Sequence, residues 1–464
     1  MLSAPHIVIL AAGRGTRMRS SKPKVLQPLL FRPMLHHVLD VAQALPHRSV
    51  SVVVGHGAED VRESCRGYSV QFFTQERQLG TAHALRCAEP FLARQEGEVL
   101  VLSGDTTLLA ESTLSGLLRA HAESGARATV ATARVAEPAG YGRVIRRDGA
   151  VVDIREHADC SAQERLIDEI NGGVYCFAIR PLLEALALIG NANRQGEYYL
   201  PDALRLIAAG GGTLASFQAA DHSEFWGVND FAALAEAEAR LSRRVNKAFM
   251  LQGLRLEDPA TTRIDPRCRF GRDVTIEAGC VLVASELEDG ATVERLSRVV
   301  GSSVGPGARI RQGSCVEESS VGAGSWVGPY AHLRPGSVLG REVRVGNFVE
   351  TKSASLGDGT KAAHLSYIGD AEIGRGVNVG CGFITCNYDG VAKRRTVIED
   401  DVFIGSDSQT VAPVRVAAGS YIASGSTVTE DVPAQSLVIS RGRQVTKPGY
   451  AKKYGERRGS PSRP

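Results

Sequence analysis

The sequence predicts two domains of different class, an α/β domain with a mainly parallel sheet followed by a parallel β-helix. In the first half, short apolar runs alternate with helical patterns, which is typical of α/β domains. In the second half, aliphatic residues recur every six positions. Glycine divides unevenly as well, because residues 1–250 contain 21 of the 50 glycines and residues 251–464 contain 29. A chain of 464 residues is also too long for one compact domain.

Composition excludes several classes of protein. The net charge of +3 is too small to indicate a nucleic-acid partner. No apolar run approaches the roughly 18 residues of a membrane helix, so we expect no membrane insertion. The nine cysteines are scattered and contain no C-x-x-C pair, which disfavours a disulfide framework or a zinc knuckle and favours a cytoplasmic protein. The apolar stretch 7–12 has no basic leader and is interpreted as a first buried strand.

The α/β domain is expected over residues 1–229. Its apolar runs predict strands at 7–10, 51–54, 99–102, 129–133 and 174–177. Helical spacing between some of them predicts helices at 33–44, 81–88 and 114–124. Ligands of such sheets usually bind beyond the carboxyl ends of the strands.

Three further segments complete the chain. Residues 230–252 are alanine-rich with helical spacing, which predicts one long linking helix. Residues 253–446 form the predicted β-helix. Residues 447–464 carry six Lys or Arg and one Glu, a net +5, and we expect this basic tail to be disordered.

The six-residue period predicts which side chains fill the β-helix. In such a fold each hexad forms one face of a triangular coil and its aliphatic residue points inward. Small residues and glycines turn the corners. The inward positions are Val304, Ile310, Val316, Val321, Val327, Leu333, Leu339, Val345, Leu356, Ala362, Ile368, Ile373, Val379, Ile398, Ile404, Thr410, Val416, Ile422 and Val428. Residues 386–395 interrupt the period, so we expect a loop that leaves the coil, and such loops are frequent binding elements.

A glycine-rich loop directly follows the first strand. Gly13 and Gly15 allow backbone N–H groups to approach an anion, and Arg17 can neutralise phosphate charge. A dinucleotide fingerprint G-x-G-x-x-G is disfavoured because Met18 stands at its third glycine position. A purely structural turn remains the alternative for this segment alone.

Two more residues extend the phosphate interpretation. Lys24 follows Pro23, and we expect it in extended backbone with its side chain presented. Asp105 follows a strand end and glycine, a suitable position for a metal ion bound to phosphate. A single lysine is more often a surface charge and a single aspartate is often structural, but the loop, Lys24 and Asp105 together favour phosphate chemistry with magnesium.

The β-helix carries a second set of polar residues. Arg334 and Lys352, expected one and a half coils apart, could converge on one face and bind a phosphate. His364 could accept a proton from an amine that attacks a thioester. Each could instead be a solvated surface residue, but the loop with Asn387 and Tyr388 has no packing reason to exist, which favours a site.

Several motifs together resemble one enzyme family. The stretches LAAGRGTRM from residue 10, PKVL from 23, QLGTAHA from 78 and SGD from 103 resemble sugar-1-phosphate nucleotidylyltransferases. The stretches GYGR from 140, REH from 155, EING from 169, GEYY from 196 and GVN from 227 narrow the resemblance. With the hexads, residues 6–447 resemble the bacterial bifunctional enzymes that are both N-acetylglucosamine-1-phosphate uridyltransferase and glucosamine-1-phosphate N-acetyltransferase. The resemblance implies a Rossmann-like mixed sheet followed by a left-handed β-helix that assembles as a homotrimer.

The resemblance also implies roles for residues of the first domain. UTP would react with N-acetylglucosamine-1-phosphate, and Mg²⁺ would be required. Lys24 and Arg17 would neutralise the phosphates and count as catalytic residues. The nucleotide would be held by Leu10, Ala12, Gly13, Lys24, Gln75, Gly80 and Thr81. The sugar phosphate would be held by Gly140, Glu156, Asn171, Tyr199 and Asn229, and the metal by Asp105 and Asn229.

In the second domain the resemblance makes His364 the base that activates glucosamine-1-phosphate for attack on acetyl-CoA. That substrate would be bound by Arg334, Lys352, Tyr367, Asn378 and Lys393. The acetyl-CoA site would be lined by Cys381, Asn387, Tyr388, Ser406, Ser424 and Arg441.

This sequence departs from the family at three positions. Trp226 replaces a frequent acidic residue, and Cys381 and Ser424 replace alanines. Cys381 is expected to be buried and inert rather than a nucleophile. Two alternatives remain. One is a monofunctional sugar-1-phosphate nucleotidylyltransferase whose β-helix serves assembly or regulation, and the other is a non-enzymatic scaffold.

Overall fold

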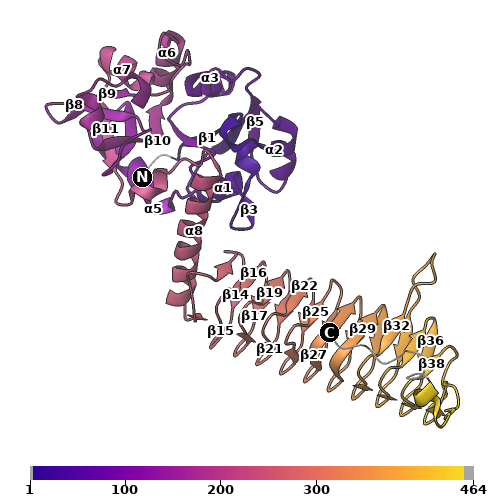
Figure 1. Cartoon of the computed structure of the whole chain (residues 1–464). Coiled ribbons are helices and arrows are strands. Elements are labelled where there is room, and N and C mark those ends of the chain that lie inside the picture. The colour runs from indigo at the N-terminus through magenta and orange to yellow at the C-terminus, as the bar shows by residue number, and fades with distance from the viewer. Residues whose placement is uncertain (1–3, 454–464) are drawn as a thin grey trace, which may run out of the picture. The chain divides into compact units, whose positions relative to one another are not determined.

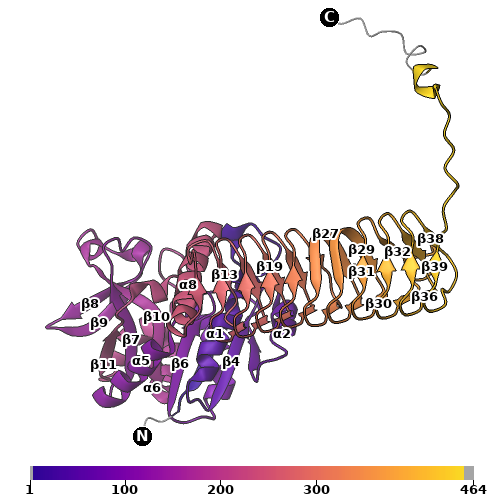
Figure 2. The ribbon, with the colours of Figure 1, turned by 90° about the horizontal axis from the view of Figure 1, so that it is seen from below.

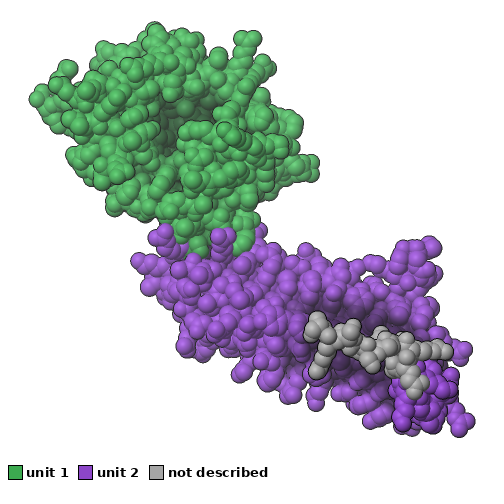
Figure 3. Space-filling view, in the orientation of Figure 1, with its two compact units in different colours: residues 1–242 green, residues 243–464 purple. Residues whose placement is uncertain are grey.

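The computed structural model describes residues 4–453 and divides the chain into two compact units, residues 1–242 and 243–464 (Figure 3). The end of the predicted basic tail, residues 454–464, lies outside the described residues. Across residues 4–453, no helix combines the length and the apolar character that a membrane crossing requires.

Unit 1 is built on a nine-stranded mixed sheet. Its main path runs β11-β7-β10-β6-β1-β4-β5, and β8 and β9 form a hairpin beside β10. Neighbouring strands on this path are parallel except that β10 is antiparallel to both β6 and β7. The strands are β1 (His6–Ala11), β4 (Ser49–Val54), β5 (Gln71–Thr74), β6 (Glu98–Ser103), β7 (Ala128–Arg134), β8 (Arg143–Arg147), β9 (Ala150–Arg155), β10 (Glu169–Ala178) and β11 (Leu214–Gln218), with a separate small hairpin of β2 (Pro28–Leu29) and β3 (Arg32–Pro33). The five predicted strands correspond to β1, β4, β6, β7 and β10.

Helices cover both faces of this sheet because its strands are apolar on both sides. Ile7 and Ile9 of β1 face one core with α1 and α5, whereas Val8 faces the other with α3, α6 and α7 (Figure 1). The helices are α1 (Met34–Ala44), α2 (Ala58–Ser64), α3 (Thr81–Arg86), α4 (Glu89–Leu92), α5 (Glu111–Ser124), α6 (Ile179–Leu188) and α7 (Asp202–Ala209). Because β1 and β6 are parallel neighbours, the loops that follow them emerge at the same edge of the sheet.

A single helix, α8 (Phe231–Leu251), contains the division between the units. In the part of α8 that belongs to unit 1, the Arg240 guanidinium lies 4.5 Å over the Trp226 ring. Near its end, Asn246 is fully buried and donates to the backbone carbonyls of Pro259 and Thr262, both at 2.8 Å. Each end of α8 is thus fixed to the unit that contains it.

Unit 2 is a parallel β-helix of short strands, from β12 (Arg255–Leu256) to β39 (Leu437–Val438) (Figure 2). One sheet holds 19 strands and wraps round two faces of the coil, and a second sheet of nine strands forms the third face. The strands of its middle part include β22 (Cys315–Glu317), β25 (His332–Leu333), β27 (Arg344–Lys352), β29 (Lys361–Gly369), β31 (Asn378–Val379), β32 (Ile384–Cys386) and β33 (Thr396–Ile398).

The predicted six-residue register is confirmed. All 19 inward positions are buried, and stacked copies lie opposite each other, as Val316 does with Leu333. The predicted interruption is confirmed as well, since β32 ends at Cys386 and β33 begins only at Thr396.

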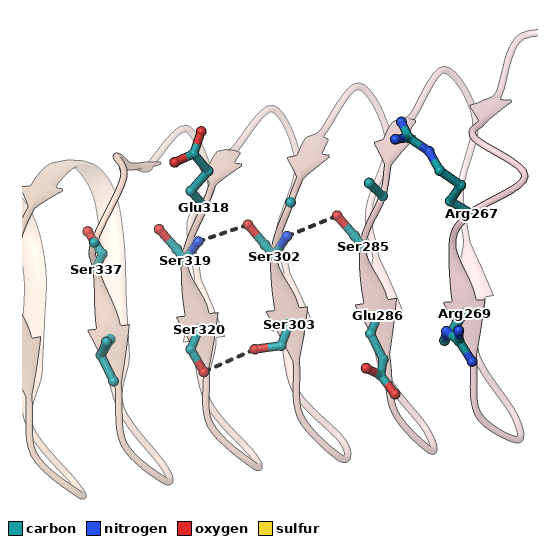
Figure 4. Close-up of a pocket in the computed structure, with 14 residues that line it drawn as sticks. Arg267, Arg269, Ser285, Glu286, Ser302, Ser303, Glu318, Ser319, Ser320 and Ser337 are labelled. Atoms are coloured by element: carbon teal, nitrogen blue, oxygen red, sulfur yellow. Dashed lines mark hydrogen bonds between the residues drawn. The ribbon is translucent and has the colours of Figure 1, made fainter. Parts of the chain in front are cut away.

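Serines form a ladder at one corner of the coils. Ser302 N donates to Ser285 Oγ at 3.2 Å, and Ser319 N donates to Ser302 Oγ at 3.1 Å (Figure 4). Each hydroxyl thus satisfies a backbone N–H of the next coil where the chain turns. The serines of this ladder line a shallow hollow of about 430 Å³ along the corner. None of the predicted site residues lines this hollow.

Candidate active sites

A cavity of about 400 Å³ opens at the carboxyl ends of β1 and β6 in unit 1. The loop after β1 forms one wall, and α3 with the segment before it forms another. All seven residues predicted to hold a nucleotide line it, and so does Asp105: Leu10, Ala12, Gly13, Lys24, Gln75, Gly80, Thr81 and Asp105. The sequence motifs thus meet in one place although they are up to 95 residues apart, from residue 10 to residue 105.

Two glycines give this cavity its shape. Gly15 has φ +61°, and a Cβ there would lie 2.6 Å from Cβ of Lys24. Gly80 has φ +110°, and a Cβ there would lie 2.5 Å from the Tyr198 carbonyl oxygen. Because both conformations disfavour other residues, each glycine keeps its loop close to the opposite wall.

Lys24 in the cavity wall contacts two residues that are distant from it in the sequence, Asp105 of the same wall and Asn229. Its ammonium group forms an ion pair with Asp105 and donates to Asn229 Oδ1 at 3.1 Å. The expectation of extended backbone at Lys24 is wrong, because Lys24–Leu26 form a 3₁₀ turn. The restriction that proline imposes acts on the residue before it, here Lys22, and Pro23 itself begins the turn.

The carboxylate of Asp105 and the amide oxygen of Asn229 therefore converge on one cation, the Lys24 ammonium. Carboxylate and amide oxygens are the ligands that hard divalent cations prefer. The donor set at this point fits a divalent metal ion.

A second cavity of unit 1, about 420 Å³, contains Glu156 and Tyr199. Burial raises the pKa of Glu156, and Asp159, Asp202 and Glu197 raise it further. Burial, followed by Asp159 and Glu156, raises the pKa of Tyr199 to about 12. The Tyr199 hydroxyl is buried and has no hydrogen-bond partner in the described part of the chain, so it is available to a ligand.

Asn171 lies next to Glu156 across Gly142. A Cβ on Gly142 would lie 3.3 Å from both Asn171 Cβ and Glu156 Oε1. The Asn171 side chain accepts from Gly173 N at 3.0 Å and contacts the Tyr175 hydroxyl. Gly140, with φ +85°, lies two residues before Gly142 and lines neither cavity.

The arginine that lines the cavity is Arg14 and not Arg17, the arginine predicted to neutralise the phosphates. Arg17 is exposed and is not among the residues that line the nucleotide cavity. Arg14 does line it, and its Nε donates to Gln78 Oε1 at 2.9 Å. The sequence analysis assigned no role to Arg14, Gln78 or Glu197, although all three lie inside quoted motifs and line this cavity. Trp226 lines neither cavity, so its departure from the family concerns packing against α8.

In unit 2, basic side chains gather at the corner that precedes β33. Arg334 N donates to the Thr351 carbonyl at 2.9 Å, so Arg334 and Lys352 are one coil apart and not one and a half. Three faces of six residues make a coil of 18 residues, and 18 residues separate Arg334 from Lys352. Lys393 lowers the pKa of Lys352 through a hydrogen bond and its charge.

Acidic and aromatic groups hold this basic cluster. Arg334 Nη1 donates to Glu350 Oε1 at 2.7 Å, and Tyr367 lies opposite Glu350 on the next coil. Asn387 Nδ2 donates to the Asp370 carboxylate and lies 3.5 Å from the Tyr367 hydroxyl. The structure thus brings together Arg334, Lys352, Tyr367, Asn387 and Lys393. Asp370 was missed, since nothing in its hexad marks it.

Asn378 lies elsewhere in the same unit. It is opposite Lys361 and Phe403, on the face that precedes the basic cluster along each coil. No contact between Asn378 and that cluster is found among residues 4–453.

His364 occupies a different corner, on β29 between those two faces. Its side chain is exposed and it lies opposite Asn347. The following coils continue this corner: Gly382 N donates to the Leu365 carbonyl, Asp407 N to that of Cys381, and Gly425 N to that of Ser406. Arg441 Nη1 donates to the Ser424 carbonyl at 2.7 Å. His364, Cys381, Ser406, Ser424 and Arg441 therefore follow one edge of the β-helix.

Cys381 is exposed, so the expectation that it is buried is wrong. It follows Gly380 at a corner of the coil, whereas Val379 is the residue of this hexad that points inward. In the interrupting loop, Tyr388 is exposed and forms a β-bridge with Lys393, and its hydroxyl donates to the Gly390 carbonyl at 2.7 Å.

Comparisons with known proteins extend over both units. Residues 7–172 match the model of the MobA-like NTP transferase domain. The bifunctional protein GlmU of Shouchella clausii is 45% identical over 97% of this chain and 100% of its own length. Those of Exiguobacterium sibiricum and Pelobacter propionicus are each 48% identical over 96% of this chain and 99% and 97% of their own lengths.

Proposed function

The chain belongs to the family of bifunctional GlmU proteins, and we propose that its two units catalyse consecutive reactions of UDP-N-acetylglucosamine biosynthesis. Unit 2 transfers an acetyl group from acetyl-CoA to glucosamine-1-phosphate. Unit 1 transfers UMP from UTP to the resulting N-acetylglucosamine-1-phosphate and releases pyrophosphate. The observation that carries the proposal is the match of the relatives over 96–97% of this chain, so that both candidate sites lie within it.

In unit 1, a phosphate oxygen of N-acetylglucosamine-1-phosphate attacks the α-phosphorus of UTP in line with the departing pyrophosphate. One P–O bond forms as another breaks, so positioning and charge neutralisation account for most of the catalysis. Lys24 and Arg17 neutralise the phosphates, and Leu10, Ala12, Gly13, Gln75, Gly80 and Thr81 hold the nucleotide. Gly140, Glu156, Asn171, Tyr199 and Asn229 hold the sugar phosphate.

We propose Mg²⁺ as the divalent metal of unit 1, held by Asp105 and Asn229. When bound, the ion supplies positive charge against the triphosphate. Lys24 must then leave the position between the two ligands, and its ammonium becomes available to a phosphate.

In unit 2, His364 accepts a proton from the amine of glucosamine-1-phosphate as the amine nitrogen attacks the thioester carbonyl. A C–N bond forms, the C–S bond breaks, and coenzyme A departs with the sulfur. Arg334, Lys352, Tyr367, Asn378 and Lys393 bind the sugar phosphate. Acetyl-CoA lies along the corner with Cys381, Ser406, Ser424 and Arg441 and reaches Asn387 and Tyr388 of the loop.

We propose that the enzyme is a homotrimer through a left-handed β-helix and that it works in the cytoplasm. Two observations support the trimer. Asn378 and the basic cluster lie on different faces of one chain, so a neighbouring subunit can complete the site. The face with Asn378 also presents Phe403 and Tyr421 stacked at 4.5 Å and exposed. For the cytoplasm, all nine cysteines are free, and both co-substrates are cytoplasmic metabolites.

One incubation tests the proposed function. The chain is mixed with glucosamine-1-phosphate, acetyl-CoA, UTP and Mg²⁺, and free thiol and pyrophosphate are followed. We expect both products, with pyrophosphate after thiol. Pyrophosphate only when N-acetylglucosamine-1-phosphate is supplied would favour the monofunctional nucleotidylyltransferase. Thiol alone would leave only the acetyltransferase, and neither product would favour a scaffold.

A further inference from the structure

A cysteine, a glutamate and a histidine meet on an outward face of the β-helix, one coil from Glu350 of the basic cluster. Cys315 and Glu317 lie on β22, two residues apart, so their side chains point to the same side of the strand. His332 lies opposite Cys315 on the neighbouring strand β25. Val316, between the two, points inward and is fully buried, so the three side chains face outward.

Their ligand atoms are close enough to share one ion. Cys315 Sγ, a His332 ring nitrogen and a Glu317 carboxylate oxygen all lie within 4.8 Å of one another, and all three residues are half-buried. His332 Nε2 and Glu317 Oε2 are 3.4 Å apart. Zinc bonds of about 2.0 to 2.3 Å in a tetrahedron separate neighbouring ligands by about 3.5 Å. Small side-chain rotations therefore suffice to close the site.

A neighbouring arginine orients the glutamate. Arg298 Nε lies 3.8 Å from Glu317 Oε1, the oxygen that does not face His332. This leaves Oε2 directed toward the histidine, and such outer contacts commonly fix metal ligands.

A second cluster of cysteine, glutamate and histidine in the described chain is largely buried, and its histidine is already hydrogen-bonded. In unit 1, His121 uses both ring nitrogens, with Thr129 at 2.8 Å and Glu98 at 2.9 Å. Its cysteine, Cys176, is fully buried in the core. That cluster is explained by packing, whereas Cys315, Glu317 and His332 are accessible from one side.

We propose that Cys315, Glu317 and His332 bind a thiophilic divalent cation of the zinc class. Thiolate, imidazole and carboxylate together select such ions over Mg²⁺, which prefers oxygen ligands alone. Three protein ligands leave the fourth position open to water or to another ligand. The cluster lies one coil from Glu350, the partner of Arg334. Because substitutions in the cluster could therefore disturb acetyl transfer indirectly, the test measures metal binding and not acetyl transfer.

Cobalt(II) is the probe, because a thiolate ligand gives it a charge-transfer absorption that oxygen ligands do not. The untagged, reduced full-length chain is titrated with Co²⁺ and then with Zn²⁺. We expect one equivalent of Co²⁺ to produce this band and Zn²⁺ to abolish it. Cys315→Ser should remove the band, and His332→Gln should weaken Co²⁺ binding because one of the three ligands is lost.

Two control variants make the test specific. Cys381→Ser removes an exposed thiol at another corner, and Asp105→Ala removes an oxygen ligand of unit 1; both should keep the band. The proposal is overturned if the wild-type chain shows no band, if the band survives Cys315→Ser, or if His332→Gln binds Co²⁺ as tightly as the wild type. Circular dichroism of each variant establishes that it is folded.

Discussion

Lys24 and Asp105 form an ion pair inside the nucleotide cavity, and the same ammonium donates to Asn229 Oδ1 at 3.1 Å. A lysine thus occupies the point where two metal-type oxygen ligands converge. If Asp105 and Asn229 hold a metal ion as we propose, we expect that ion and Lys24 to compete for Asp105 until a phosphate draws the ammonium away.

Replacing Lys24 should strengthen metal binding while it weakens catalysis. In Lys24→Ala, we expect the nucleotide-free chain to bind Mn²⁺ about tenfold more tightly, because a charge-assisted hydrogen bond of about 1.5 kcal/mol no longer competes. Uridyl transfer should fall, since the phosphates lose a cation. Electron paramagnetic resonance of free Mn²⁺ measures the affinity. Lys22→Ala, an exposed lysine nearby, is the control. Unchanged or weaker Mn²⁺ binding in Lys24→Ala would show that the two cations do not compete.

Removing His364 should affect one reaction only. His364→Ala is expected to lower acetyl transfer about 10²- to 10⁴-fold, the usual contribution of a general base. Uridyl transfer should stay near the wild-type rate because its residues lie in unit 1. Separate assays of thiol and pyrophosphate release measure the two rates. His222→Ala, an exposed histidine of unit 1, is the control. Parallel loss of both activities in a folded chain would argue against His364 as the base.

The hexad core should carry the stability of unit 2. Leu333 is fully buried, whereas Val338 is 52% exposed. We expect Leu333→Ala to lower the free energy of unfolding by about 2–5 kcal/mol and Val338→Ala by about 0.5 kcal/mol or less. The chain has two tryptophans, Trp226 and Trp326, one in each unit. In a Trp226→Phe background, Trp326 fluorescence follows urea unfolding of unit 2 alone. Equal effects of the two substitutions would contradict the assigned inward register.

Burial of Glu156 should make the stability of unit 1 fall with rising pH. Burial raises the pKa of this carboxyl, so the folded chain binds the proton more tightly than the unfolded chain does. Protonation of Glu156 therefore contributes to the free energy of unfolding. This contribution is fully present below the ordinary carboxyl pKa and is lost as the pH rises through the raised pKa. Glu156→Gln should remove this part of the slope, measured by urea unfolding at several pH values in a Trp326→Phe background. Glu123→Gln, an exposed glutamate of α5, should leave the slope as it is. A slope unchanged in Glu156→Gln would contradict the burial effect.

Much of the fold of unit 2 could be predicted from the six-residue spacing of its aliphatic residues alone. A six-residue spacing fixes which side chains point inward, so the inward positions of Val316 and Leu333 could be predicted from their spacing. The same reasoning located the loop at 386–395, because an insertion in a solenoid can only leave the coil. Antiparallel β10 could not be predicted, since a strand buried on both faces has the same pattern in either direction.

The sites were predictable where a motif marks them and not elsewhere. The seven residues that we propose to hold the nucleotide line one cavity, because they lie at or near strand ends on the same edge of the sheet. Asp370 was not foreseen because its contact with Asn387 depends on where the loop folds back. Cys381 was misjudged because small size at a corner does not imply burial.

A mixture of two variants, each inactive in one of the two reactions, tests whether the two sites act independently and in sequence. Asp105→Ala should retain acetyl transfer and lose uridyl transfer, and His364→Ala should do the reverse. Neither alone should form UDP-N-acetylglucosamine from glucosamine-1-phosphate, acetyl-CoA, UTP and Mg²⁺. Mixed in one vessel, the two folded variants should form it, because the intermediate can pass from one to the other. A mixture that forms none, while each variant retains its remaining half-reaction, would contradict two independent sites that act in sequence.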